Sequence, residues 1–197
     1  MDELQIEKKK LRKDILKIRR NLAYVTIEFE SNAIINHLKR SELFESSKTV
    51  MCYLSMKDEV QTYEIVDYAL KQGKSVCVPY IRDRAGIMDA VVIQDLNELV
   101  RGDFDILTGN PLNMNIVNTE EIDLLIMPGV AFDRYGHRLG MGAGFYDRFL
   151  DKANCTKLVG LALSCQVLDV VPSMPHDYSV HYLVTKDGII NCKTGKM

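Results

Sequence analysis

Apolar residues recur at every third or fourth position near the start of the chain, among basic side chains. Leu11, Ile15 and Leu22 follow this spacing, which predicts an amphipathic helix over residues 3–22. A second helix is predicted to begin at Thr26 and to run past residue 38. Each helix has one apolar face, so we expect both to cover a layer that lies deeper in the fold.

Short apolar runs rich in strand-forming residues predict that this layer is a β-sheet. The first run is Thr-Val-Met-Cys-Tyr-Leu at residues 49–54, and the pair Asp187-Gly188 predicts a hairpin turn near the end. Strands that alternate with helices indicate a three-layer, Rossmann-like α/β fold, with a mostly parallel sheet and helices on both faces. The other predicted strands span residues 75–79, 87–93, 123–127, 158–163, 182–185 and 189–192, and the other predicted helices span residues 63–71 and 145–152.

Ligands of open parallel sheets bind outside the carboxyl ends of the strands. Three predicted loops follow strands in this position, at residues 54–62, 128–144 and 164–177. We therefore expect these loops to lie together and to form the functional site.

Length and cysteine content indicate the number of domains and the cellular compartment of the protein. The 197 residues suffice for one domain with a sizeable core, so we expect a single domain over residues 1–197. Five cysteines without a Cys-x-x-Cys pair argue against a disulfide framework or a zinc site, and favour a reducing compartment. No apolar run predicts a signal peptide or a membrane span. We expect a cytoplasmic monomer without a membrane partner.

The net charge of −2 hides an asymmetry along the chain. Residues 1–20 contain eight Lys or Arg against four Asp or Glu, which makes this segment +4 and the remainder −6. Such a basic helix is suited to an anionic ligand. Nucleic acid is not expected as a partner, because a chain with a pI of about 6.1 lacks the general basic surface that phosphate backbones require.

The segment from Met127 to Leu150 contains five of the twelve glycines. Alternate glycines at positions 140, 142 and 144 let the backbone approach an anion closely, and Arg138 and Arg148 on either side can neutralise phosphate oxygens. A purely structural turn is the alternative interpretation. The spacing fits neither a dinucleotide-binding fingerprint nor a Walker-type phosphate loop.

Three carboxylates near the predicted strand ends each have two interpretations. Asp147 either stabilises the start of the predicted helix or binds Mg²⁺. Asp177 either closes a Pro-His-Asp turn or supplies a second Mg²⁺ ligand. Glu59 is either a solvated loop charge or the group that holds the amide and amino edge of a heterocycle. Similarly, the cations of residues 8–12 either bind a ligand or form the wet face of the first helix.

Several fragments, in order along nearly the whole chain, together carry a resemblance. The strongest is Gly136-His-Arg-Leu-Gly-Met-Gly-Ala-Gly-Phe-Tyr-Asp-Arg148. The others are Lys8-Lys-Lys-Leu-Arg12, Tyr53-Leu-Ser-Met-Lys-Asp-Glu-Val-Gln-Thr62, Met127-Pro-Gly-Val-Ala-Phe-Asp133 and Pro175-His-Asp177. In this combination the chain resembles the 5-formyltetrahydrofolate cyclo-ligase family, also called 5,10-methenyltetrahydrofolate synthetase.

The resemblance implies ATP- and Mg²⁺-dependent closure of 5-formyltetrahydrofolate to 5,10-methenyltetrahydrofolate, with release of ADP and phosphate. It implies catalytic roles for Arg138 and Tyr146, and Mg²⁺ binding by Asp147 and Asp177. ATP would be bound by Lys8, Lys9, Lys10, Leu11, Arg12, Arg138, Leu139, Gly140, Met141, Gly142, Ala143, Gly144, Phe145 and Tyr146. The folate would be contacted by Leu54, Glu59, Met141, Gly142, Ala143, Gly144 and Phe145.

Two positions depart from the family pattern. Ala143 stands where lysine is common, and His181 stands where an aspartate commonly follows the His-Asp turn. Two other functions stay open on these residues. One is a folate-binding or regulatory relative that has lost turnover, and the other is an ATP-dependent enzyme of the same fold that acts on another small molecule.

Overall fold

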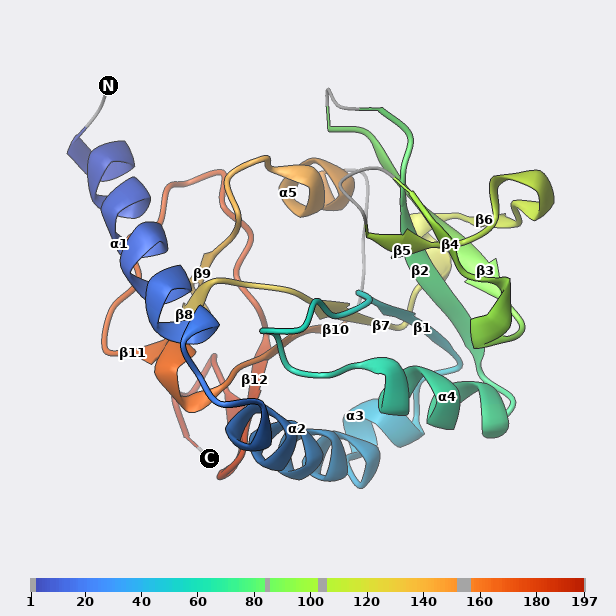
Figure 1. Cartoon of the computed structure of the whole chain (residues 1–197), viewed down its shortest axis with the longest axis horizontal. Helices are drawn as coiled ribbons and strands as arrows, with labels where there is room; N and C mark the ends of the chain where they lie inside the picture. Colours follow the sequence, from blue (N-terminus) through green and yellow to red (C-terminus); the bar gives the residue numbers. More distant parts are fainter. Residues whose placement is uncertain (1–2, 84–85, 103–105, 152–156, 197) are drawn as a thin grey trace.

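A computed structural model describes residues 3–83, 86–102, 106–151 and 157–196. Its centre is an eight-stranded sheet in the order β13-β12-β10-β7-β1-β2-β3-β6 (Figure 1). The five strands from β12 to β2 are parallel, while β13, β3 and β6 pair antiparallel at the two edges. In that order the strands span Gly188–Asn191, Tyr182–Thr185, Lys157–Leu161, Leu124–Met127, Thr49–Cys52, Ser75–Ile81, Met88–Ile93 and Ile116–Val117.

Helices cover both faces of this sheet, as the sequence predicts. In β1, Val50 and Cys52 pack into the apolar cluster on one face, whereas Met51 between them packs into the cluster on the other. This alternation is the two-residue period of a strand buried on both sides. Figure 1 shows α2, α3 and α4 on one side of the sheet and α5 on the other. These helices span Tyr24–Lys39, Glu42–Glu45, Tyr63–Lys71 and Phe145–Leu150.

The predicted central elements are confirmed, with shifts of a few residues at their ends. Helix α1 spans Glu3–Arg20 and therefore ends two residues before position 22. Strand β1 ends at Cys52 and not at residue 54, because Tyr53 turns away from the ladder. The carbonyl oxygen of Tyr53 accepts a hydrogen bond from Thr62 Oγ1 at 2.7 Å, which closes the loop over residues 54–62. Of the predicted helix over residues 145–152, position 152 lies outside the described residues.

A second, three-stranded sheet occupies the region where the sequence predicts only loops. Its order is β11-β8-β9, and α1 packs on it through Leu11 and Ile15. Figure 1 shows α1 beside these strands, outside the main sheet. Strands β8, β9 and β11 span Ala131–Asp133, Arg138–Leu139 and Val167–Leu168. A separate two-stranded sheet is formed by β4 and β5, which span Val100–Arg101 and Leu107–Thr108. Short 3-10 helices span Leu96–Glu98, Pro111–Asn113, Thr119–Glu121 and Ser164–Gln166.

In the described part of the chain, no helix is both long enough and apolar enough to cross a bilayer. The four cysteines in this part, Cys52, Cys77, Cys165 and Cys192, are free thiols. Cys155 lies outside the described residues.

Candidate active site

The chain after β7 is held in a fixed hairpin by the fully buried carboxylate of Asp133. Its Oδ1 accepts hydrogen bonds from the backbone N–H groups of Tyr135 and His137, at 2.9 and 3.0 Å. Its Oδ2 accepts from the backbone N–H of Val171 at 2.9 Å and lies 2.8 Å from Nδ1 of His137. These bonds join β8, the turn and the chain after β11, so they fix Arg138 at the entrance to the glycine loop.

Glycine is required at two positions of that loop. Gly142 and Gly144 have φ angles of +102° and +69°, a region that side chains other than glycine rarely adopt. A Cβ atom at Gly142 would also lie 3.4 Å from Cζ of Arg12. The loop thus carries a cation against its backbone, which favours the anion-binding interpretation over a purely structural turn.

Helix α1 brings two of its predicted cations to this loop. Arg12 Nε donates to the carbonyl oxygen of Gly140 at 2.8 Å. Lys8 Nζ donates to Asp177 Oδ2 and forms an ion pair with it. Burial lowers the pKa of Arg12, and the nearby Asp177 raises it by a smaller amount. The basic helix therefore reaches the glycine loop, and the family resemblance assigns both to ATP.

The other three predicted residues of α1 lie differently. Leu11 packs in the apolar cluster beneath the helix, beside Leu139 of β9. Lys9 and Lys10 are exposed, and Lys10 lies on the opposite side of the helix from Lys8 and Arg12. Only one face of the basic segment thus contacts the site, and Lys9 and Lys10 match the alternative of a solvated helix face.

The two predicted metal ligands are close to each other. Asp147 Oδ1 accepts from Arg138 Nη2 at 2.7 Å and from the backbone N–H of Tyr178 at 3.3 Å, which places it beside the turn that carries Asp177. Asp177 Oδ2 accepts from the backbone N–H of Met174 at 2.6 Å. Burial raises the pKa of Asp177, but the hydrogen bonds from Lys8 and Met174 bring it below its ordinary value.

These carboxylates fit a Mg²⁺ ion that arrives with phosphates. No group of three or more His, Cys, Asp or Glu side chains in the described part of the chain is arranged to hold a metal alone. Mg²⁺ usually takes one or two carboxylates together with waters and substrate phosphates. Asp147 and Asp177 supply two carboxylates, and each has a basic side chain, Arg138 or Lys8, beside it for a phosphate to engage.

Glu59 is buried, so the interpretation of it as a solvated loop charge is wrong. Its exposed fraction is 8%, and its Oε2 accepts from the backbone N–H of Met56 at 2.9 Å. Its Oε1 lies 3.6 Å from Nη1 of Arg19. Burial raises the pKa of Glu59, whereas the hydrogen bond from Met56 and the charge of Arg19 lower it. A buried carboxylate in the loop after β1 is suited to bind hydrogen-bond donors of a ligand.

Tyr146 lies between the glycine loop and Glu59. Its ring packs against the apolar clusters on both faces of the sheet, which places it at the edge where they meet. Burial raises the pKa of its phenol, as do the Cys52 thiol and the Glu59 carboxyl, while Arg138 lowers it. Tyr146 is therefore a neutral hydrogen-bond donor near neutral pH and not a base.

Arg148 connects two loops and does not point freely toward a phosphate. Its Nη2 donates to the carbonyl oxygen of Ala143, and its Nε donates to that of Gly86 at 3.2 Å. Its guanidinium carbon also lies 5.9 Å from the centre of the Phe145 ring. In this structure Arg148 thus ties the hairpin between β2 and β3 to the glycine loop.

The remaining predicted residues differ in accessibility. Met141 and Ala143 are exposed at the tip of the glycine loop, with 51% of Met141 accessible. Leu54 is only 4% exposed and packs in the core on the α2 side of the sheet, so its side chain presents little surface to a ligand. His181 holds strands together: its backbone N–H donates to the carbonyl oxygen of Leu158, and its Nδ1 accepts from the N–H of Leu158.

Two buried arginines each have one donor atom without a hydrogen-bond partner among the described residues, although that of Arg19 lies 3.6 Å from Oε1 of Glu59. No described residue hydrogen-bonds Nη1 of Arg19 or Nε of Arg138. A buried donor without a partner is costly, so such atoms mark positions where a ligand or water completes the bonding. Sequence reasoning missed Arg19. Its signal was present, because Arg19 follows Arg12 by seven residues and therefore lies on the same face of a helix.

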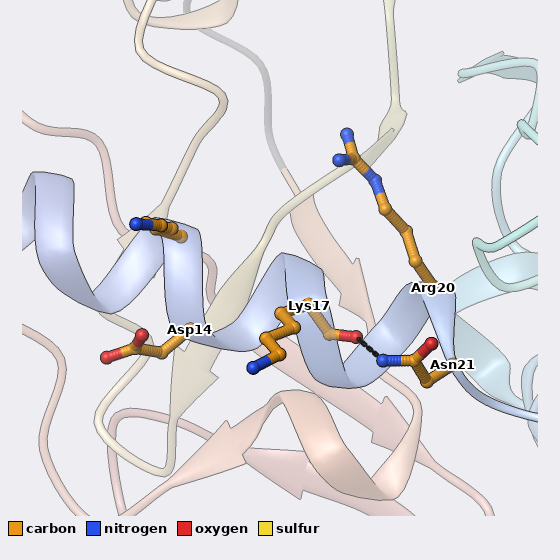
Figure 2. Close-up of a pocket in the computed structure, with 5 residues that line it drawn as sticks. Asp14, Lys17, Arg20 and Asn21 are labelled. Carbon is orange, nitrogen blue, oxygen red and sulfur yellow. Dashed lines mark hydrogen bonds between the residues drawn. The ribbon is translucent and has the colours of Figure 1, made fainter.

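A shallow depression on the outer face of α1 is separate from this cluster (Figure 2). Its lining comes from α1 and the residue after it, and includes none of the predicted site residues. Figure 2 shows Asn21 bonded to the carbonyl oxygen of Lys17, at 2.9 Å. The depression is lined by Lys13, Asp14, Lys17, Arg20 and Asn21.

Parallel strand ends that gather cations, carboxylates and a glycine loop are typical of α/β enzymes that act on anionic ligands. Comparison with known proteins narrows this class. The model of the family described as "5-formyltetrahydrofolate cyclo-ligase family" matches residues 5–186. The chain therefore belongs to the 5-formyltetrahydrofolate cyclo-ligase family of enzymes.

Individual relatives agree with this family. The 5-formyltetrahydrofolate cyclo-ligase of Mycolicibacterium smegmatis is 33% identical over 188 residues, which cover 93% of this chain and 96% of the relative. That of Saccharomyces cerevisiae is 30% identical, with 93% and 97% covered. The NMR structure of Aquifex aeolicus 5,10-methenyltetrahydrofolate synthetase superimposes with a TM-score of 0.84 at 32% identity, covering 96% of this chain and 95% of that one.

Proposed function

We propose that the protein closes 5-formyltetrahydrofolate to 5,10-methenyltetrahydrofolate, with ATP converted to ADP and phosphate. The observation that carries the proposal is the contact between the basic helix and the glycine loop. Arg12 donates a hydrogen bond to Gly140. Lys8 pairs with Asp177, and Arg138 pairs with Asp147. The two carboxylates are neighbours, because Asp147 accepts from the backbone N–H of Tyr178, the residue after Asp177. Three cations and two carboxylates from distant parts of the chain thus surround one loop.

ATP is proposed to bind at this loop. Lys8, Arg12 and Arg138 can bind phosphate oxygens, and the exposed backbone at positions 141–143 is open to close approach. Asp147 and Asp177 would hold Mg²⁺, which neutralises charge on the phosphates as the phosphoryl group moves. In this arrangement Lys8 and Arg138 exchange their carboxylate partners for phosphate.

The folate is proposed to bind toward the end of β1. Glu59 keeps Oε1 for the amide and amino edge of the pterin, since its Oε2 is bonded to the backbone of Met56. Tyr146, between Glu59 and Arg138, would form a wall of the site and donate a hydrogen bond. Leu54 contributes through its backbone or after a movement, because its side chain is buried.

The reaction needs positioning and charge neutralisation more than a protein nucleophile. The γ-phosphoryl group is transferred to the formyl oxygen, which becomes a good leaving group. N10 of the same folate then attacks the formyl carbon and the ring closes. Phosphate leaves with that oxygen, and the proton lost from N10 ends on the released phosphate. Arg138 would stabilise the charge on the transferred group, and Arg12 would orient the phosphate chain. Neither step requires a residue to form a covalent bond.

The test is to mix the protein with 5-formyltetrahydrofolate and Mg-ATP and to follow the absorbance of the methenyl product. An ATP-dependent rise is expected, with one ADP formed for each product molecule. Omission of ATP or addition of a chelator should abolish the rise. If no product forms while calorimetry shows tight binding of folate, the protein is a folate-binding relative without turnover. The exposed Ala143, whose own side chain brings no cation to the loop tip, favours that second function.

A further inference from the structure

Arg19 is one of the most deeply buried charged residues of the described chain, with an exposed fraction of 1%. Its Nε donates to Asp58 Oδ2 at 3.0 Å, and its Nη1 lies 3.6 Å from Glu59 Oε1. Both acids belong to the loop after β1, whereas Arg19 comes from the last turn of α1. A buried guanidinium between two carboxylates has a strong preference for one geometry, because losing either partner leaves a charge uncompensated.

The position of Arg19 along α1 connects the two halves of the proposed site. Arg12 contacts the glycine loop from the same face of the helix, seven residues earlier. Seven residues of α-helix correspond to about 10 Å along the axis. One rigid element therefore contacts the phosphate-binding loop near its middle and the Glu59 loop at its end.

We propose that Arg19 is a positioning residue, which sets the orientation of the Glu59 carboxylate so that its Oε1 accepts hydrogen bonds from the folate heterocycle. The inference rests on the proposed function, since it concerns how the same site holds its substrate. Arg19 acts through Glu59: its Nη1 is buried and faces Oε1, the oxygen that is not bonded to the backbone. Arg19 thus defines the direction in which Glu59 accepts.

The surroundings of Glu59 explain why it needs this cation. Besides Arg19, the described groups that act on it or feel its charge include Asp58 in its own loop, Tyr53 after β1, Tyr63 in α4 and Tyr146 in α5. Of these described groups, Arg19 alone is a cation. Burial and the charge of Asp58 raise the pKa of Glu59, and Arg19 opposes them. A protonated Glu59 would offer one acceptor fewer to the amino and amide N–H groups of a pterin.

The experiment compares Arg19→Met with the parent enzyme, with Arg20→Met as the matched control. Arg20 is the next residue, also an arginine, but it is exposed and lies on the outer face of α1 (Figure 2). We expect Arg19→Met to raise KM for 5-formyltetrahydrofolate about tenfold or more, with a much smaller change in KM for ATP. The acid limb of its pH profile for kcat/KM should move upward by about one pH unit. Arg20→Met should match the parent enzyme in all three.

A second variant separates positioning from general damage. In a Glu59→Gln background, Arg19→Met should cause little further rise in the folate KM, because the residue through which it acts has lost its charge. Arg19→Lys retains the cation without the planar fork, so it should restore the pH profile and part of the affinity. If Arg19→Met does not fold, Arg19→Lys in both backgrounds carries the same comparison.

The outcomes also separate this proposal from the proposed function. Calorimetry of folate binding without ATP should show weaker binding by Arg19→Met whether or not turnover occurs. Equal folate affinity and superimposable pH profiles in Arg19→Met and the parent enzyme would refute the role of Arg19. Equal effects of Arg19→Met in the parent and Glu59→Gln backgrounds would also refute it. A parent protein that neither binds nor converts folate would refute the proposed function, and the role of Arg19 with it.

Discussion

Replacement of Asp133 by asparagine tests whether one buried carboxylate builds the entrance to the site. Asp133 is fully buried and has four close polar contacts, two at each oxygen. An asparagine retains one oxygen and places an amide N–H₂ group at the other, so it faces the backbone N–H of Val171 and Nδ1 of His137. The Val171 donor loses its partner, whereas His137 can change tautomer and accept.

The loss of unfolding free energy expected for Asp133→Asn follows from these contacts. Hydrogen bonds to a charged acceptor contribute about 1.5–3 kcal/mol each, so one complete loss together with the weakened remainder should cost about 3 kcal/mol of unfolding free energy. Urea denaturation measures this difference. Turnover should fall as well, because the hairpin that fixes Arg138 loosens. Asp169→Asn is the control, since Asp169 is exposed and lies two residues before Val171. An unfolding free energy of Asp133→Asn within about 0.5 kcal/mol of the parent would refute this reasoning.

Three further predictions concern the phosphate half of the site. Asp147→Ala should abolish most turnover and weaken the Mg²⁺ dependence with the fold intact by circular dichroism; unchanged Mg²⁺ titrations would exclude Asp147 as a ligand. Arg12→Met should raise KM for ATP at least about tenfold with little change for folate, and an equal rise for both substrates would contradict the placement of ATP. The pKa of Asp177 is lowered in the folded protein, so the stability that it gains from Lys8 is present above its unfolded pKa of about 3.9 and is lost as the pH falls through the lower folded value. Urea midpoints of the parent and Lys8→Met should therefore differ at pH 6 and converge in strong acid, and a constant difference would exclude this pair as the source.

The sheet could be predicted because its strands carry their own signal. The run that begins at Thr49 contains enough consecutive apolar residues to identify a buried strand, and the same holds at residues 124–127. Strands β8, β9 and β11 could not be predicted, because two or three residues have no detectable period. They exist through contacts between distant segments, above all those that Asp133 makes with Val171.

The sequence could suggest which residues belong to the candidate site, but not which of them contact one another. Motif order identified Arg12 and Gly140, but only folding brings these residues together across 128 positions of sequence. The burial of Glu59 was not predictable, since a charged residue in a loop is usually solvated. Glu59 is buried beside Arg19, which is itself buried. The burial of Arg19 was not predictable either, because Arg19 is one of many charged residues on a basic helix.

The contact of α1 with the glycine loop also bears on Ala143, one of the two residues that depart from the family pattern. Ala143 places no cation at the exposed tip of the loop, where lysine is common in the family. Arg12 approaches the same tip from another element, since its guanidinium carbon lies 3.4 Å from where a Cβ of Gly142 would be. A cation held on a helix is better fixed than one on a loop tip, because its position does not depend on the flexible glycines. In this chain the contribution of Arg12 to the charge at the loop therefore depends on the docking of α1. Variants that loosen α1 from β9, such as Leu11→Ala, should thus weaken ATP binding although Leu11 itself lies in the apolar cluster beneath the helix. An unchanged KM for ATP in Leu11→Ala would show that the loop binds phosphate without α1.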